Sequence, residues 1–171
     1  MSCKDEKQTV KVLRIRPDAK LPAYASVGAA AADVCTISDC SVAINPGCSQ
    51  LFRTGLKFEI PVGWEIKVHS RSGHGFKHGI RLSNCTGILD SDYTGELMVK
   101  LTNDSETVYK VQPFERICQI QVCRAVQHDF VETLGELKVT ERGEAGFGST
   151  GTTELGSHNH PLGVDAFIKN M

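Results

Sequence analysis

Apolar and polar residues alternate along several short stretches of the chain. The alternation is clear at residues 10–12, 56–60, 64–69, 97–101 and 118–122. Because a period of two places side chains on opposite faces of an extended strand, these stretches predict half-buried strands. Turn-forming residues separate them at 45–47, 61–63, 103–105 and 112–113, and no long window has the apolar period of a capped helix. The pattern predicts an all-β domain, a barrel or sandwich of short strands.

The alternation fades near residue 135, and glycine, serine and threonine become frequent after it. The 171 residues are enough for one domain with a sizeable core. We therefore predict a β-barrel domain over residues 1–135. Residues 136–171 would form a flexible C-terminal arm that carries a glycine-rich stretch and a polar tail.

Composition and charge exclude several classes of protein. Hydrophobic residues make up 40% of the chain and charged residues 23%, as in ordinary soluble proteins. The formal net charge of −1 argues against a nucleic-acid partner. No apolar run approaches the roughly 20 residues of a membrane helix, and the charged start MSCKDEKQTV lacks an apolar signal region. We expect no membrane partner and a cytoplasmic location, or a nuclear or host-cytoplasmic one for a eukaryotic or viral source.

The chain has seven cysteines, an odd number, and no CxxC pair. A disulfide framework is not expected without a sign of secretion. A zinc site is the alternative, but buried reduced thiols that pack as small hydrophobes explain the cysteines better.

Residues 69–75 form the first of three segments with candidate chemistry. Arg71 is followed by Ser72 and Gly73. The arginine fork suits phosphate oxygens, serine adds a hydroxyl, and glycine lets backbone N–H groups approach an anion closely. The alternative is a strand-to-turn junction with a surface arginine.

The second segment spans residues 84–95, where Gly87 and Gly95 bracket a hairpin-like turn. Asp90 within it can act as a general base toward water. Tyr93 can pack its ring against a sugar or a base. An Asx turn formed by Asp90 and Asp92 is the alternative.

The third segment is RGEAGFGSTG, residues 142–151. It is not a Walker loop, because no GK[ST] follows and no strand–helix context surrounds it. A flexible linker is the alternative. Arg142 with glycine N–H groups would suit a phosphate chain, and Phe147 would suit an aromatic base, so the segment predicts an arm that covers a nucleotide.

Five segments in order resemble the motifs of the trimeric deoxyuridine triphosphatase (dUTPase) family. They are residues 30–34, 71–73, 87–95, 113–119 and 142–149, within a match over roughly 10–151. The resemblance implies a jelly-roll-like β-barrel of the β-clip type and a homotrimer with shared active sites. It also implies that dUTP is hydrolysed to dUMP and pyrophosphate with Mg²⁺ as cofactor. This reaction would limit uracil incorporation into DNA and supply dUMP for dTMP synthesis.

The resemblance also implies roles for individual residues. Asp90 would activate the attacking water, Gln119 would bind near the α-phosphate or that water, and Asp33 would support Mg²⁺ indirectly, through water. The substrate-binding residues would be Arg71, Ser72, Gly73, Asn84, Gly87, Ile88, Leu89, Tyr93, Met98, Arg142, Phe147, Gly148 and Ser149. Among them, Arg142 would grip the γ-phosphate and Phe147 would cover the uracil.

The chain departs from the family pattern at several positions. Ala31 and Ala32 stand before the first aspartate, Ser70 replaces a usual proline, Phe114 a common glycine, and Ala145 a usual glycine. None of these changes removes a group with an implied catalytic role. They bear on local loop geometry.

Two other functions stay open. One is dCTP deamination, or a bifunctional activity, on the same fold, for which Glu96 is the only nearby candidate for the deaminating carboxylate. The other is a non-catalytic nucleotide-binding regulator of a partner protein. The presence of Asp90, Gln119 and Arg142 favours catalysis over pure regulation.

Overall fold

The computed structural model describes residues 9–146, which form eleven strands and one short helix. In chain order they are β1 Lys11–Arg14, β2 Ala23–Tyr24, β3 Ala32–Cys35, β4 Val42–Ile44, β5 Ser49–Glu59, β6 Trp64–His69, α1 Ser72–His78, β7 Ile80–Leu82, β8 Thr86–Leu89, β9 Glu96–Asn103, β10 Tyr109–Val111 and β11 Arg116–Arg124. No helix among these residues has the length and apolarity needed to cross a membrane.

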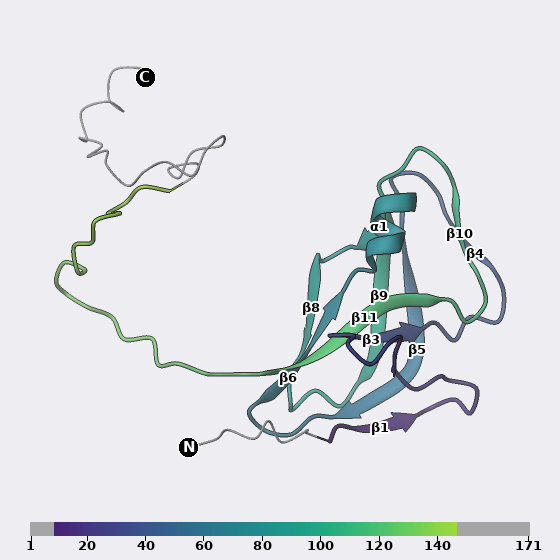
Figure 1. Cartoon of the computed structure of the whole chain (residues 1–171), viewed down its shortest axis with the longest axis horizontal. Helices are drawn as coiled ribbons and strands as arrows, with labels where there is room; N and C mark the ends of the chain where they lie inside the picture. The colour runs from purple at the N-terminus through teal and green to yellow at the C-terminus, as the bar shows by residue number, and fades with distance from the viewer. Residues whose placement is uncertain (1–8, 147–171) are drawn as a thin grey trace. The chain divides into compact units, whose positions relative to one another are not determined.

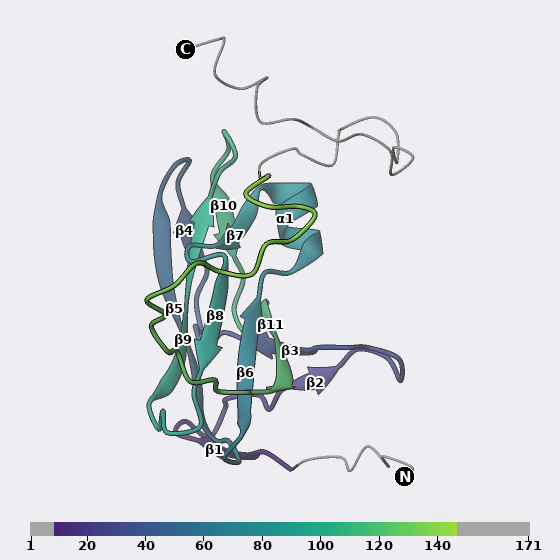
Figure 2. The same cartoon turned by 90° about the vertical axis from the view of Figure 1, so that its left-hand side faces the viewer.

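The strands form three antiparallel sheets. The five-stranded sheet has the order β2-β3-β11-β6-β8, the four-stranded sheet β1-β5-β9-β7, and a small third sheet pairs β10 with β4 (Figures 1 and 2). Helix α1 lies near β10 and β7 at one end of the domain, and β1 lies at the other (Figure 2). The all-β prediction is confirmed. Across the described residues, the jelly-roll-like arrangement consists of separate sheets rather than one closed barrel.

One hydrophobic core joins the two larger sheets. Ile66 of β6 and Ile120 of β11 belong to the same buried cluster as Leu56 of β5 and Val99 of β9. Along β9 burial alternates residue by residue, as the apolar period there predicts. The core therefore fixes which face of each strand is free to carry polar groups.

Helix α1 was not predicted, and it replaces the strand-to-turn junction that was the alternative for residues 69–75. It is only seven residues long and contains Gly73 and Gly75, so it carries no helical period. It ends at Gly79, whose φ of 65° is the left-handed conformation of a helix C-cap. The helix buries His74, which indicates that tertiary packing rather than propensity stabilises it.

The hairpin-like turn predicted between Gly87 and Gly95 is also different. Strand β8 pairs with β6, whereas β9 pairs with β5 and β7. Residues 90–95 therefore connect the two large sheets and do not close a hairpin. As a result, β8 is an edge strand of the five-stranded sheet.

The cysteines are only partly as predicted. The six in the described residues are free thiols. Cys118 is buried, and burial raises its pKa to about 12. Cys35 is half-buried and burial also raises its pKa. The expectation of buried thiols is wrong for Cys40, Cys48 and Cys85, which are exposed.

The structure shows the local geometry at two positions that depart from the family pattern. Phe114 has a φ of 53°, in the left-handed region that glycine adopts most readily. Its ring lies 5.5 Å from Nζ of Lys20. The hydroxyl oxygen of Ser70 accepts the N–H of Leu82 at 2.9 Å, a bond that proline cannot form. Serine therefore ties the end of β6 to β7.

The chain divides into two compact units between His128 and Asp129. The described part of the second unit, residues 129–146, contains no helix or strand. The domain boundary after residue 135 and the arm over 136–171 stay predictions.

Gly55 is expected to be essential for stability. It has a φ of 69°, and an added Cβ would lie 2.9 Å from Cβ of Ala19 and 2.9 Å from Cγ2 of Ile37, both buried residues. Gly55→Ala is expected to lower the free energy of unfolding by about 2–4 kcal/mol through strain and overpacking. Urea denaturation at fixed protein concentration measures this. Gly47→Ala is the control, since Gly47 has a φ of 70° but open space around it, and should lose only about 1 kcal/mol.

Candidate active site

An open pocket of about 560 Å³ lies beside β8 and β9. We call it the base pocket. Its lining includes the predicted site residues Asn84, Gly87, Ile88, Leu89, Asp90, Tyr93 and Met98, together with Leu51, Val68, Leu82, Ser83, Glu96, Leu97, Val99 and Lys100. The structure therefore brings together every site residue that the sequence predicts between residues 84 and 98.

The base pocket exposes an unusual amount of apolar surface. Ile88 is 58% exposed, Leu51 51%, Met98 49% and Tyr93 43%. Sequence reasoning missed Leu51, because Leu51 and Phe52 are adjacent and give no alternation. Since β8 is an edge strand, it also leaves backbone N–H and C=O groups without a strand partner. Apolar walls beside free backbone groups suit a planar heterocycle with a polar edge.

Gly95 determines where the ring of Tyr93 lies. The Tyr93 hydroxyl donates to the carbonyl of Glu96 at 3.0 Å, and the Tyr93 N–H donates to the carbonyl of Asp90 at 3.1 Å. A Cβ on Gly95 would lie 2.4 Å from the tyrosine hydroxyl oxygen. The ring can occupy its position in the pocket only because residue 95 has no side chain.

The Glu96 carboxylate has a structural role. It accepts from Nε of Arg53 at 2.9 Å and from the N–H of Gly55 at 2.8 Å, and Nη2 of Arg53 lies 2.8 Å away. Both oxygens are therefore engaged where β5 changes its register with β9. This arrangement speaks against Glu96 as the carboxylate of a deaminase.

A second group of predicted residues surrounds Asp33, which is buried. Its carboxylate accepts from Nη1 of Arg116 at 2.9 Å and from Nε2 of Gln119 at 3.1 Å. Nε of Arg71 lies 3.4 Å from the same carboxylate. We call Asp33, Arg71, Arg116 and Gln119 the arginine cluster. Arg116 is a member that sequence reasoning did not assign, although it lies within the fourth motif.

Within one chain, the base pocket and the arginine cluster share no residue, and Asp90 lies far from Gln119. Strand register places Asp33, Gln119, His69 and Thr86 in one row across the five-stranded sheet. Asp90 follows β8 four residues beyond Thr86. At about 3.3 Å per residue and about 4.8 Å per strand, the backbones of Asp90 and Gln119 are about 16 Å apart. One chain therefore does not bring together the two residues predicted to be catalytic.

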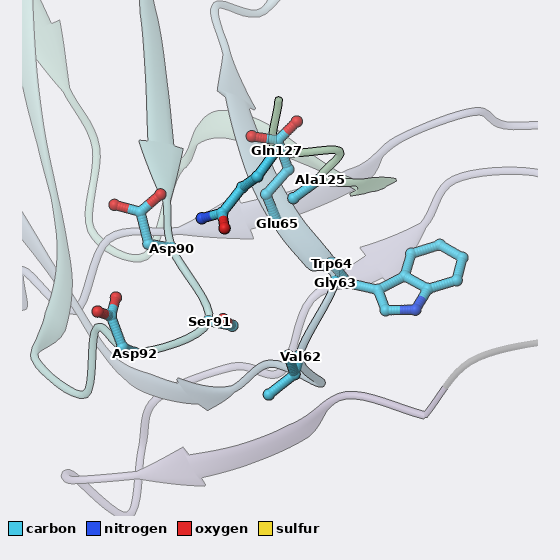
Figure 3. Close-up of a pocket in the computed structure, with 9 residues that line it drawn as sticks. All are labelled: Val62, Gly63, Trp64, Glu65, Asp90, Ser91, Asp92, Ala125 and Gln127. Carbon is cyan, nitrogen blue, oxygen red and sulfur yellow. The ribbon is translucent and has the colours of Figure 1, made fainter. Parts of the chain in front are cut away.

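Asp90 is exposed and also borders a second pocket of about 580 Å³, which residues 62–65, Ala125 and Gln127 help to line. Figure 3 shows the carboxylates of Asp90 and Asp92 on the loop after β8, with the Gln127 side chain directed toward Asp90 and the Trp64 ring pointing away. Solvent therefore reaches the Asp90 carboxylate, as a group that acts on water requires.

The fifth motif is only partly described. Nε of Arg142 donates to the carbonyl of Ala145 at 2.8 Å, and both residues are exposed. Phe147, Gly148 and Ser149 lie outside the described residues. No group of three or more metal-binding side chains occurs among residues 9–146.

The described residues form an all-β domain with an apolar pocket beside an edge strand and a separate arginine cluster, an arrangement that suits a small anionic ligand. The dUTPase family profile matches residues 17–151. Curated relatives named deoxyuridine 5'-triphosphate nucleotidohydrolase include one from Nautilia profundicola, 44% identical over 83% of this chain and 98% of its own, and one from Syntrophotalea carbinolica, 42% identical over 84% and 97%. The chain belongs to the dUTPase family, which confirms the resemblance seen in its motifs.

Solved structures agree on the fold. A dUTPase of Staphylococcus bacteriophage 80alpha, bound to dUpNHpp, has a TM-score of 0.77 and 23% identity, over 85% of this chain and 100% of its own. A dUTPase from phage phi11 of S. aureus, described with a structural Mg(II) ion, has a TM-score of 0.66 and 18% identity, over 75% and 98%.

Proposed function

We propose that this protein hydrolyses dUTP to dUMP and pyrophosphate. Membership of the dUTPase family supports the reaction. The observation that carries the assignment to this chain is the base pocket, where an apolar cavity, an edge strand and Asp90 lie together. In the cell this reaction limits uracil incorporation into DNA and supplies dUMP for dTMP synthesis.

Backbone groups of β8 would select uracil. Uracil presents an N3–H donor between two carbonyl acceptors, whereas cytosine presents an acceptor at N3 and an amino group at C4. If Gly87, Leu89 and the Asn84 amide present an acceptor between two donors, they match the uracil pattern and not the cytosine pattern. Against cytosine they would leave buried polar groups unpaired, which can discriminate by about 10⁴-fold.

The arginine cluster and the start of α1 would hold the phosphates. Arg71 supplies a guanidinium that Asp33 already orients. Ser72 and Gly73 begin α1, where backbone N–H groups have no partner within the helix. In the proposed complex, Arg142 grips the γ-phosphate and Phe147, Gly148 and Ser149 close over the nucleotide.

The chemical step would be attack of water on the α-phosphorus. Asp90 takes the proton from the attacking water, and the bond to the pyrophosphate leaving group breaks. Gln119 orients the water or an α-phosphate oxygen. Positioning and charge stabilisation supply most of the remaining acceleration.

Mg²⁺ fits this site only as an ion held mainly by the substrate. Asp33 already accepts from Arg116 and Gln119, and no cluster of three metal-binding side chains occurs among residues 9–146. Asp33 can still support Mg²⁺ through a water molecule, since its Oδ2 has a single hydrogen-bond partner within residues 9–146. When bound, Mg²⁺ would neutralise charge on the triphosphate.

A homotrimer with shared sites completes the proposal. The separation of Asp90 from Gln119 supports it, because a second copy can place its arginine cluster beside the base pocket of the first. Each site would then combine groups from neighbouring subunits.

Pyrophosphate release from each of the four dNTPs, dUTP and UTP, with Mg²⁺ or with EDTA, tests the function. We expect pyrophosphate release only from dUTP, and only in the presence of Mg²⁺. Equal release from every nucleotide would refute the base pocket as the selective element. Ammonia released from dCTP would establish the deaminase alternative.

Gly95→Ala is expected to weaken discrimination against the ribose 2′-hydroxyl. The added methyl would displace the Tyr93 ring, which we place beneath the deoxyribose. The ratio of kcat/KM for dUTP to that for UTP should fall by about tenfold or more. Gly28→Ala, at a glycine with open space around it, is the control and should leave the ratio unchanged.

A further inference from the structure

His74 is a buried imidazole that the proposed reaction does not use. It lies in α1, three residues after Arg71, and is 5% exposed. Its Nε2 is 2.8 Å from Oε1 of Glu115 and 3.2 Å from Nη1 of Arg71. Its ring packs edge-on against Tyr109, with centroids 5.7 Å apart. His74 therefore links the proposed phosphate-binding arginine to a carboxylate just before β11.

The proton of the imidazole lies on Nε2. Glu115 also accepts the Tyr109 hydroxyl at 2.7 Å and the Gln112 N–H at 2.6 Å. Burial acts to raise the pKa of Glu115, but the bonds from Gln112, Tyr109 and His74 outweigh burial, and the pKa is lowered. A carboxylate can only accept, so Nε2 of His74 is the donor.

The imidazole is also neutral. Nδ1 of His74 is buried and has no hydrogen-bond partner within residues 9–146. Burial lowers the pKa of His74 more than the bond to Glu115 raises it, and the charge of Arg71 lowers it further. The uncharged ring of His74 is therefore held by Glu115 and packs against the guanidinium of Arg71.

The contact with His74 restricts the guanidinium of Arg71 to one orientation. Because Nε2 of His74 is a donor, Nη1 of Arg71 donates instead to the carbonyl of Arg116 at 2.9 Å. Nε of Arg71 faces Asp33 at 3.4 Å. In the described part of the chain Nη2 has no partner, so two of the five guanidinium donors remain available to a ligand.

We propose that His74, held by Glu115, is a positioning residue for the triphosphate. It keeps Nη2 of Arg71 turned toward phosphate oxygens and anchors the first turn of α1, with Ser72 and Gly73. Without the His74 ring, the Arg71 side chain would have to be ordered each time the nucleotide binds, which weakens the affinity for the nucleotide. The inference rests on the proposed function, since Arg71 must bind phosphate.

The test compares His74→Leu with His74→Gln. Leucine fills the buried space without a donor, whereas the glutamine amide can still donate to Glu115. His74→Leu is expected to raise KM for dUTP about tenfold and to change kcat by less than about twofold. His74→Gln should stay within about threefold of the wild-type KM. The inhibition constant of deoxyuridine, which has no phosphate, should be unchanged in both.

An unchanged KM in His74→Leu would overturn the inference. So would an equal loss of deoxyuridine affinity, because a general structural defect affects base and phosphate alike. Glu115→Gln tests the contact between His74 and Glu115 without a change in α1, and it should also raise KM for dUTP. If wild-type protein failed to hydrolyse dUTP, the proposed function would fall instead.

A double-mutant cycle shows whether His74 acts through Arg71. Affinity for a non-hydrolysable dUTP analogue is measured by calorimetry. In an Arg71→Ala background, His74→Leu is expected to cost clearly less affinity than in the wild-type background, since Arg71, one of the groups that it positions, is gone. A further loss equal to that in wild-type background would contradict the proposal.

Discussion

Asp90→Asn is expected to lower kcat for dUTP by about 10³-fold, the range for loss of a general base. The amide keeps the shape of the carboxylate but cannot accept a proton from water. Asp90 borders the base pocket at the end of β8 and is exposed to solvent. Affinity for a non-hydrolysable dUTP analogue should therefore persist, because the carboxylate acts on water and does not hold the base.

Asp92→Asn is the matched control for this experiment. Asp92 is an exposed carboxylate in the same loop, and it lines the second pocket but not the base pocket. Its replacement should leave kcat within about twofold of wild type. Steady-state kinetics of pyrophosphate release measures both variants. A kcat for Asp90→Asn close to the wild-type value would remove Asp90 from the reaction.

Local pattern predicted most of the fold and failed where packing decides. The alternation at residues 64–69 matches β6, and that at 97–101 lies within β9. Strand β5 is longer than its predicted part, because its register with β9 shifts between Arg53 and Lys57 and the alternation breaks there. Helix α1 was missed because the burial of His74, which stabilises it, depends on distant residues.

In the site, too, local sequence predicted some features, and long-range packing determined the others. The site residues predicted between 84 and 98 line one pocket, since they are close in sequence. Leu51 joins them only because β5 pairs with β9 across a long sequence separation. Likewise, the distance between Asp90 and Gln119 follows from the strand order β11-β6-β8. Strand order is a property of the whole sheet, which no single motif encodes.

Mixed oligomers are expected to recover activity that neither parent has. Asp90→Asn removes the base from the base pocket, and Arg71→Ala removes the proposed phosphate ligand from the arginine cluster. Each homo-oligomer should be nearly inactive. If every site combines Asp90 of one copy with Arg71 of its neighbour, random mixing at equal amounts leaves about a quarter of sites intact, one half multiplied by one half.

Co-refolding of the two variants, followed by measurement of pyrophosphate release, tests this. Asp90→Asn mixed with Asp90→Ala is the control and should show no recovery, because every site then lacks the same group. Activity in the first mixture equal to the mean of its parents would place both groups in a single chain. That result would contradict the separation of about 16 Å between Asp90 and Gln119 on the five-stranded sheet. Recovery toward a quarter of wild-type activity instead requires that neighbouring copies complete each other's sites.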